Sequence, residues 1–240
     1  MRRLSVMAAA LAAVVAVGCN SSDNRAANGS AVGTAGRAEN SVSSGDRDFV
    51  RDVAVMNMAE IELSRTALQK AAGADVKKFA QMMIDDHPPA GDKLKAVAAQ
   101  HRIEVPAQLD DKHREHGEKL AAKQGLEFDK DYADAMVDGH QDFVDKLESR
   151  IDKDTLSKWR ASRDNTAHGT ATGTAHGSAT ANPPANPDAK VEAAAVTAEK
   201  SDDPATMAIN QWAAQTYPVA YAHLEAAKAL RDGVKKRSTN

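Results

Sequence analysis

The sequence predicts an all-α protein whose main part is a four-helix bundle. In four separate segments, apolar residues recur at alternating intervals of three and four, which is the period of an amphipathic helix. The 42% hydrophobic content is rich in alanine and only 4% of the residues are aromatic. This composition suits closely packed helices better than sheets. The 240 residues are enough for one or two domains with a sizeable core.

The charge pattern excludes one large class of partner. The formal net charge is −3, and acidic and basic residues are interspersed along the chain. Nucleic-acid binding requires an extended basic field, which this pattern does not provide. The basic residues in the tail 233–240 form a small cluster that we interpret as a solvated end. We therefore expect no nucleic-acid partner.

Residues 1–18 have the features of a bacterial lipoprotein signal peptide. A short basic start is followed by an apolar stretch at 4–17, which is too short to span a membrane comfortably. Small residues then precede Cys19, the one cysteine of the chain. This resembles a lipobox, which implies that Cys19 carries lipid, including palmitate, and becomes the new N-terminus. The alternative is an ordinary secretory signal with an incidental cysteine.

The residues after the cysteine predict where the protein lies. Asn20 takes the place where Asp would favour retention in the inner membrane of a Gram-negative cell. We therefore expect attachment to the outer membrane, facing the periplasm, with the membrane as partner through Cys19. No protein partner can be inferred. Residues 19–45 are rich in Ser, Gly, Ala and Asn, which predicts a flexible tether. Lipidation would leave no thiol for a disulfide.

The first bundle helix is predicted to begin with Asp46 as its N-cap and to end before Gly73, a suitable C′ residue. The residues that recur at these intervals form the apolar stripe of the helix, which consists of Phe49, Val53, Met56, Glu60, Leu63 and Ala67. Glu60 is the polar exception in the middle of this apolar stripe.

The second helix is predicted over 75–101. Its stripe consists of Val76, Ala80, Met83, His87, Ala90, Leu94, Val97 and His101. His87 lies in mid-stripe, where a buried imidazole needs a hydrogen bond, a charge or a metal. Pro88 and Pro89 each remove a backbone donor, which predicts a kink.

A connector follows at 102–126 and contains a short charged helix at about 110–123. His113 and His116 lie three residues apart on this helix, but charged residues surround them. We interpret the two histidines as a solvated surface pair rather than a metal site.

The third bundle helix is predicted over 129–152, and it completes the segment 46–162. Its stripe consists of Ala133, Met136, His140, Phe143, Leu147 and Ile151. His140 is the polar exception here. A short continuation through Leu156 and Trp159 is expected.

Residues 163–203 form a low-complexity insertion. A Thr-Ala-His-Gly sequence occurs twice, around His168 and His176, and is followed by a segment rich in Asn and Pro. This composition favours disorder, so we interpret the insertion as a solvated spacer rather than a metal-binding segment.

The fourth bundle helix is predicted over 204–232, with Asp203 as N-cap and Pro204 at the first helical position. Its stripe consists of Ile209, Trp212, Thr216, Val219, His223, Ala226 and Leu230. Pro218 predicts a bend. His223 is the polar exception, and it lies later in its helix than the other three do in theirs.

One ionisable residue per helix, in phase with the apolar stripe, is the main functional signal. These residues are Glu60, His87, His140 and His223. Bundle proteins build metal and cofactor sites between facing helices. Three imidazoles and a carboxylate suit one divalent metal ion such as Zn, Fe, Mn or Cu. The sequence therefore predicts a mononuclear metal site or a small-ligand site in the core.

Other residues are candidates for a supporting role. Asp86 is expected to orient His87 or to add a second carboxylate, and Tyr217 and Tyr221 to supply hydroxyls around the ligands.

Two alternatives to a metal or ligand site stay open. A Glu–His network without metal would explain the same pattern in a structural or interaction lipoprotein of the envelope. An enzyme is less favoured, because no Ser-His-Asp, paired-carboxylate or phosphate-loop arrangement is evident. The sequence therefore predicts no catalytic residue.

Several motifs resemble one family of bacterial envelope proteins. The most specific is Met-x-x-Asp-His at 83–87; looser ones are Phe-Val at 49–50, Ala-Glu-Ile-Glu-Leu at 59–63, Phe-Asp at 128–129 and His-Leu at 223–224. The family is labelled "predicted outer membrane protein", the domain of unknown function four-one-four-two, and the resemblance covers about 46–160 and 203–230. It implies a ferritin-like four-helix fold and an envelope location, and no settled activity.

The chain also departs from patterns that this resemblance suggests. Pro88 and Pro89 stand where the family has a continuous helix, and the insertion separates the last two helices. Di-iron relatives of ferritin carry Glu three residues before a ligand His. Here the residues three before His87, His140 and His223 are Ile84, Val137 and Ala220. A di-iron oxidase is therefore not expected.

Overall fold

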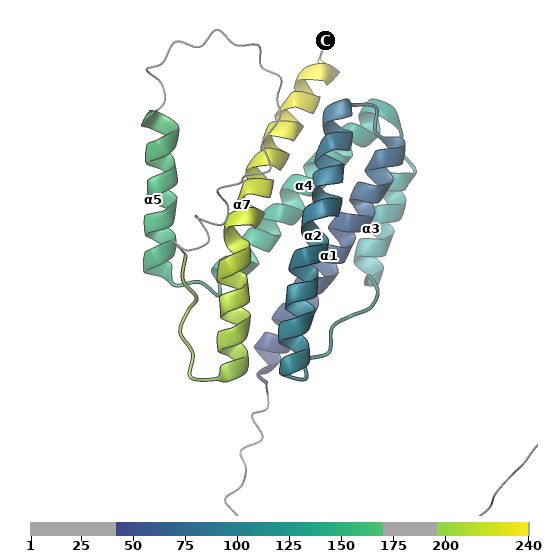
Figure 1. Cartoon of the computed structure of the whole chain (residues 1–240). Helices are drawn as coiled ribbons and strands as arrows, with labels where there is room; N and C mark the ends of the chain where they lie inside the picture. Colours follow the sequence, from purple (N-terminus) through teal and green to yellow (C-terminus); the bar gives the residue numbers. More distant parts are fainter. Residues whose placement is uncertain (1–41, 170–195, 240) are drawn as a thin grey trace, which may run out of the picture. The chain divides into compact units, whose positions relative to one another are not determined.

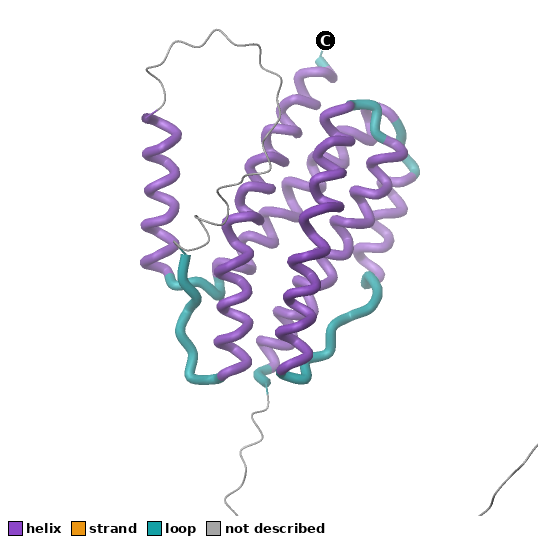
Figure 2. The backbone as a smooth tube through the Cα atoms, viewed as in Figure 1, coloured by secondary structure: helices purple, strands orange, loops and turns teal. Residues whose placement is uncertain are grey.

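The computed structural model describes residues 42–169 and 196–239 of the chain. Within these residues the regular secondary structure is helical, with isolated bridges and no strand (Figure 2). The predicted all-α class is confirmed. The residues predicted as a signal peptide, Cys19, most of the predicted tether and the centre of the predicted insertion lie outside the described residues.

Four long helices form the bundle, and two shorter ones lie on its outside (Figure 1). The long helices are α1 (Ser44–Lys70), α2 (Ala74–Gln100), α4 (Gly125–Glu148) and α7 (Pro204–Ser238). The shorter helices are α3 (Asp111–Ala121) and α5 (Lys153–Gly169). Around the bundle, α1 packs against α2, α2 against α7, α7 against α4, and α4 against α1. Every long helix therefore has one face directed at the common core.

The core is filled by the apolar stripes of these helices. The largest fully buried side chains include Tyr132, Tyr217, Phe128, Met83, Leu94, Met136, Leu147, Ile151, Ile209 and Leu224. Burial of such side chains is worth roughly 1.5–3 kcal/mol each, which makes the stripes the main source of stability. None of the helices in the described ranges combines the length and apolar character needed to cross a membrane.

The N-terminal end of α1 differs from the prediction. Ser43 is the N-cap, because its side chain accepts a hydrogen bond from the Asp46 backbone N–H. Asp46 lies inside the first turn, and its Oδ2 accepts a hydrogen bond from the Ser43 hydroxyl. The predicted N-cap role of Asp46 is wrong, because the polar residue three positions earlier caps the helix.

The turn between α1 and α2 is held by a distant carboxylate. Asp129 of α4 accepts hydrogen bonds from the backbone N–H groups of Ala72 and Gly73 at 2.9 and 2.8 Å. Gly73 has a φ of −76° and is the residue before α2. It is therefore not the left-handed C′ residue of α1 that the sequence predicts.

The predicted kink in α2 and bend in α7 do not interrupt either helix. One α-helix runs through Pro88 and Pro89 in α2, and another through Pro218 in α7. Side chains on both sides of the two prolines of α2 attach this helix to the bundle. In α2, His87 and Leu94 are buried on either side of them, and the Trp212 indole donates a hydrogen bond to the Ala90 carbonyl.

The later boundaries also differ from the predictions. α4 begins at Gly125, whose φ of +62° suits glycine, and ends at Glu148. The expected continuation past Asp152 is a separate helix, α5, that extends to Gly169. α7 continues through Gly233 to Ser238 because Val234 is buried and extends the apolar stripe by a turn.

The end of the predicted insertion is part of the bundle. Val196 is buried, the Asp152 N–H donates to the Thr197 carbonyl, and the Glu199 N–H donates to the Arg150 carbonyl. Residues 196–203 therefore connect to α7 along the end of α4 rather than forming part of a spacer.

Candidate metal centre

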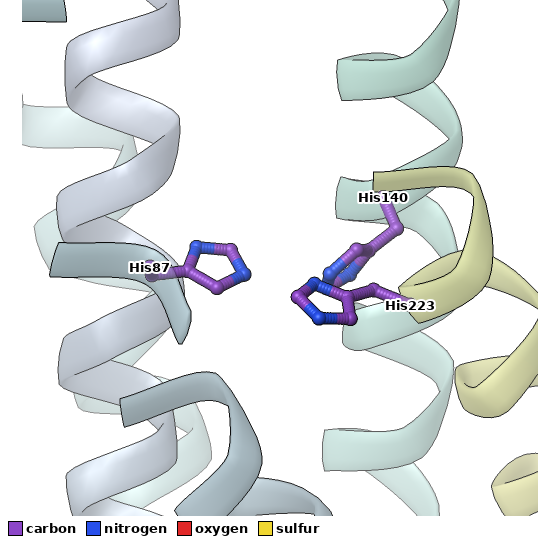
Figure 3. A group of neighbouring side chains, drawn as sticks. All are labelled: His87, His140 and His223. Carbon is purple, nitrogen blue, oxygen red and sulfur yellow. The ribbon is translucent and has the colours of Figure 1, made fainter. Parts of the chain in front are cut away.

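Three histidines from three helices meet in the middle of the bundle. His87 projects from α2 toward His140 of α4 and His223 of α7 (Figure 3). Their ring centroids are 5.5 to 5.6 Å apart in all three pairs. One nitrogen from each ring lies within 4.8 Å of the other two. The exposed fractions are 6% for His87, 0% for His140 and 7% for His223, so the cluster is buried.

Glu60 of α1 joins the cluster from the side. Its Oε2 is 3.3 Å from His87 Nδ1, and its Oε1 is 3.4 Å from His140 Nδ1. The structure therefore brings together all four residues that the stripes single out. Glu60 faces the Nδ1 atoms of two rings, and its oxygens are not among the ligand atoms that lie within 4.8 Å of one another.

The hydrogen bond of His140 defines which of its nitrogens is free. Its Nδ1 lies 2.8 Å from the Met136 carbonyl oxygen, which can only accept, so Nδ1 carries the proton. Burial lowers the pKa of His140 to about 3, so the ring is neutral. Its Nε2 therefore carries a lone pair, and this buried atom has no hydrogen-bond partner among the described residues. Such an orphaned acceptor is uncommon and requires an explanation.

His223 is held by a carboxylate from the neighbouring helix. Its Nε2 is 3.0 Å from Asp86 Oδ2. The hydrogen bond from His223 lowers the pKa of Asp86, so this carboxylate is ionised at neutral pH. Asp86 was expected to orient the adjacent His87. It contacts His223 instead, because consecutive residues of a helix point about 100° apart.

Each imidazole ring therefore has a polar neighbour next to one of its two nitrogens, and the other nitrogen is available for a ligand. The neighbours are Glu60 for His87, the Met136 carbonyl for His140 and Asp86 for His223. Metal-binding histidines in proteins almost always have such a partner on the second nitrogen, because it fixes the tautomer and the ring orientation.

The electrostatics of the site favour a cation. Burial lowers the pKa of His87 well below its usual value, as it does for His140. Burial also raises the pKa of Glu60 to about 8, and Glu60 Oε1 has no hydrogen-bond partner in the described part of the chain. Neutral imidazoles are the form that binds metal ions. A positive ion beside Glu60 would also compensate for the cost of burying its carboxylate.

Gly139 is a positioning residue that the sequence analysis did not identify. A Cβ atom at this position would lie 2.9 Å from Glu60 Oε1, which is too close for the observed arrangement. A glycine inside a helix costs about 1 kcal/mol relative to alanine, so its place next to His140 was an available signal. The glycine therefore leaves room for the Glu60 carboxylate beside α4.

The predicted tyrosines do not belong to the site. The Tyr217 hydroxyl donates to Glu148 Oε1 at 2.9 Å, and the rings of Tyr217 and Tyr221 both pack against Trp159 of α5, with centroids 5.1 Å apart. This aromatic group attaches α5 to α7. The prediction that these hydroxyls surround the ligands is therefore wrong.

The remaining histidines lie elsewhere. His113 of α3 pairs with Asp110 at 2.6 Å, and His116 is exposed, in agreement with a surface pair. His176 lies outside the described residues, as does the side chain of His168.

The fold and the site together define a helical-bundle protein with a buried three-histidine cluster supported by two carboxylates. A family model described as "Domain of unknown function (DUF4142)" matches residues 31–169, which is more than half of the chain. The chain belongs to this family, and the resemblance seen in its motifs is confirmed. The matched residues include Glu60, His87 and His140, whereas α7 and His223 lie beyond them. Comparisons with curated proteins and with solved structures give no match.

Proposed function

We propose that this protein binds one first-row transition-metal dication through His87, His140 and His223. The observation that carries the proposal is the arrangement of the ring nitrogens. Each neutral or buried ring has a polar partner on one nitrogen, and the three rings offer ligand atoms within 4.8 Å of one another. A purely structural histidine has no need of an unpartnered Nε2 such as that of His140.

The spacing fits an ion after a small adjustment. Zn–N bonds of about 2.0–2.1 Å place two nitrogens of a tetrahedral site about 3.4 Å apart. The limit of 4.8 Å among the present atoms is larger by little more than 1 Å. Rotations of the side chains are sufficient to close this difference, so the backbone need not move.

The donor set selects the kind of ion. Imidazole nitrogens suit Zn, Cu and Fe best, whereas Mg²⁺, Ca²⁺ and Mn²⁺ prefer oxygen ligands. Two carboxylates, Glu60 and Asp86, contact the outer nitrogens. Burial raises the pKa of Glu60 to about 8, so Glu60 would balance part of a +2 charge only when the nearby ion lowers that pKa and ionises the group. Three protein ligands leave a fourth position for water or a small ligand.

The replacement of His140 by Phe tests the proposal. The full chain, purified without an affinity tag and stripped with a chelator, is titrated with Zn²⁺ by calorimetry. We expect one site in the unchanged protein and a loss of affinity of at least about 100-fold in His140→Phe, because one of three ligands is gone. The control is His116→Phe, which removes an exposed histidine outside the cluster and should bind as before.

The alternative is that the Glu–His cluster only stabilises the core of an interaction protein. The contact of Glu60 with two rings is what favours it. Under this alternative the unchanged protein binds less than one equivalent of metal, and chelation leaves its melting temperature unchanged. His140→Phe would then remain able to bind a protein partner. Those results would remove the metal proposal.

We also propose that the bundle is attached to a membrane of the bacterial envelope through lipid on Cys19, facing the periplasm. The support is the sequence of residues 1–19 and the tether-like composition that follows. Labelled palmitate should be incorporated into the full chain expressed in a Gram-negative host, and Cys19→Ser should lose both the label and the membrane fraction. Equal membrane association of the two proteins would contradict the proposal.

A further inference from the structure

The cluster is unequally covered on its different sides. His140 of α4 is 0% exposed, whereas His87 of α2 and His223 of α7 are 6% and 7% exposed. These two rings are stacked, with an interplanar angle of 14°. The cluster therefore comes nearest to solvent at the seam between α2 and α7, where these two rings lie.

Asp86 occupies this seam. Its side chain is 42% exposed, and its Oδ2 accepts the 3.0 Å hydrogen bond from His223 Nε2. It is thus both open to solvent and in direct contact with a ring of the cluster. Its pKa is lowered by the hydrogen bond from His223, so it carries a full negative charge under physiological conditions.

The other carboxylate of the site is a poorer point of entry. A groove between α1, α3 and α4 reaches Glu60 and is lined also by Met56, His116 and Gly139. Glu60 is only 5% exposed, and its Oε1 lies against the backbone at Gly139. A cation in this groove would meet the Nδ1 side of His87 and His140, where the His140 Nδ1–H already donates a hydrogen bond to the Met136 carbonyl.

We propose that the dication enters between α2 and α7 and that Asp86 is the residue that captures it. This inference rests on the metal-binding function proposed above and adds its route. The carboxylate attracts the hydrated cation and exchanges with one of its water ligands. The ion then passes to Nδ1 of His223, because Nε2 of this ring keeps its hydrogen bond to Asp86, and on to the nitrogens of His87 and His140. No bond other than metal coordination forms or breaks, and the released water returns to the solvent.

Uptake kinetics distinguish capture from a merely supporting role. Co²⁺ is mixed with the chelator-stripped full chain in a stopped-flow instrument, and its visible absorption reports binding. Asp86→Asn keeps an acceptor oxygen for His223 and removes the charge. We expect its association rate constant to fall about tenfold or more and to depend less steeply on ionic strength, as for other steered associations.

Asp85→Asn is the matched control. Asp85 is the adjacent exposed carboxylate, and its recorded bond is to Gln81 on the same helix rather than to the cluster. Removing its charge should change the association rate constant by no more than about twofold, because a single surface charge without contact to the site is largely screened.

Three outcomes would overturn the inference. An unchanged association rate in Asp86→Asn, with only faster dissociation, would show that Asp86 merely positions His223. An equal loss in Asp85→Asn would show general attraction by surface charge. A larger loss in Gly139→Ala than in Asp86→Asn would place the entrance at the groove beside Glu60. If the unchanged protein takes up no Co²⁺ at all, the proposed function itself fails, which is a separate result.

Discussion

At the scale of single residues, the partner of one ring nitrogen determines what the other can do. The His140 Nδ1–H donates a hydrogen bond to the carbonyl four residues earlier on its own helix, which leaves a buried lone pair on Nε2. Leaving a buried polar atom unpaired costs about 1–3 kcal/mol. Under the proposed function, a bound metal ion would recover this cost.

Gly139→Ala tests the positioning of Glu60. Because the new Cβ would lie 2.9 Å from Glu60 Oε1, the carboxylate must move away from the two Nδ1 atoms that it faces. We expect metal affinity to fall about tenfold or more, as when other outer partners of metal ligands are lost. Calorimetric titration with Zn²⁺ measures it.

Gly117→Ala in α3 is the control for helix propensity. A Cβ there meets only the Leu63 side chain, at 3.9 Å, so the change should leave metal affinity unaltered and stabilise α3 slightly. Unaltered metal affinity in both variants would show that the position of Glu60 is unimportant for binding.

The sequence allows the four cluster residues to be predicted but not their bonds. The sequence identifies these four residues because each one is a polar residue at a position of an otherwise apolar stripe. They are Glu60, His87, His140 and His223. The contact of Asp86 with His223 depends on how α2 and α7 are rotated about their axes, and the acceptor for His140 is a main-chain oxygen. Neither of these two contacts can be predicted from the pattern of residue types in the sequence.

At the scale of helices, α2 carries two prolines close to a proposed ligand. Pro88 and Pro89 cannot donate to the carbonyls of Ile84 and Asp85, yet the helix continues. Tertiary packing therefore stabilises a segment with poor intrinsic helix propensity.

Pro89→Ala should stabilise the protein by about 1–2 kcal/mol. The variant gains a backbone hydrogen bond. It also replaces proline, whose helix propensity is about 3 kcal/mol less favourable than that of alanine. The unfolded chain gains conformational entropy, which offsets part of this stabilisation. Pro89 is exposed, so no packing is lost. Urea unfolding measures the difference, and a destabilised variant would contradict this explanation.

Three helices are joined at one end by the buried side chain of Asp46. It accepts hydrogen bonds from Ser43 before α1, from Arg150 after α4 and from Thr206 in α7. Burial alone would raise the pKa of Asp46, but these hydrogen bonds outweigh it, and the pKa is lower than the ordinary 3.8.

Asp46→Asn should destabilise the bundle by about 2 kcal/mol at pH 7, because a charge-assisted network is lost. Because the folded pKa of Asp46 is lowered, its contribution is present above pH 3.8 and is lost as pH falls further through the folded value. The difference between the two proteins should therefore shrink at lower pH. Urea unfolding from pH 7 to pH 3 measures this.

Asp48→Asn provides the comparison at the same end of α1. Asp48 is exposed and pairs with Arg51 on its own helix, so its loss should cost no more than about 0.5 kcal/mol. A difference for Asp46→Asn that grows as pH falls would contradict the assigned pKa direction.

The existence of the helices is easier to predict than their ends. Amphipathic periodicity identifies all four long helices, but several nearby residues can cap each one, and burial decides between them. The burial of Val234 carries α7 past Gly233, and so His223 lies near the middle of its helix rather than late in it.

At the scale of the whole molecule, each long helix contributes one polar residue to the common core. Because α1, α2, α7 and α4 follow one another around the bundle, Glu60 and the three histidines converge from four sides. The cluster also links parts of the chain that are far apart in sequence. Metal binding is therefore expected to stabilise the entire bundle.

Metal should raise the melting temperature of the full chain and chelation should lower it. A ligand at 100 times its dissociation constant stabilises the folded state by about 2.7 kcal/mol. His140→Phe should show little of this effect, whereas His116→Phe should show all of it. Scanning calorimetry with added Zn²⁺ or with chelator measures both, and an equal shift in the two variants would indicate binding outside the cluster.

The most direct test of the metal centre is anomalous diffraction at the zinc absorption edge, from crystals of the tag-free protein grown with Zn²⁺. We predict one strong peak inside the bundle, about 2.0–2.1 Å from one nitrogen each of His87, His140 and His223. No peak at the cluster, or peaks only at surface residues such as His113 and His116, would contradict the account.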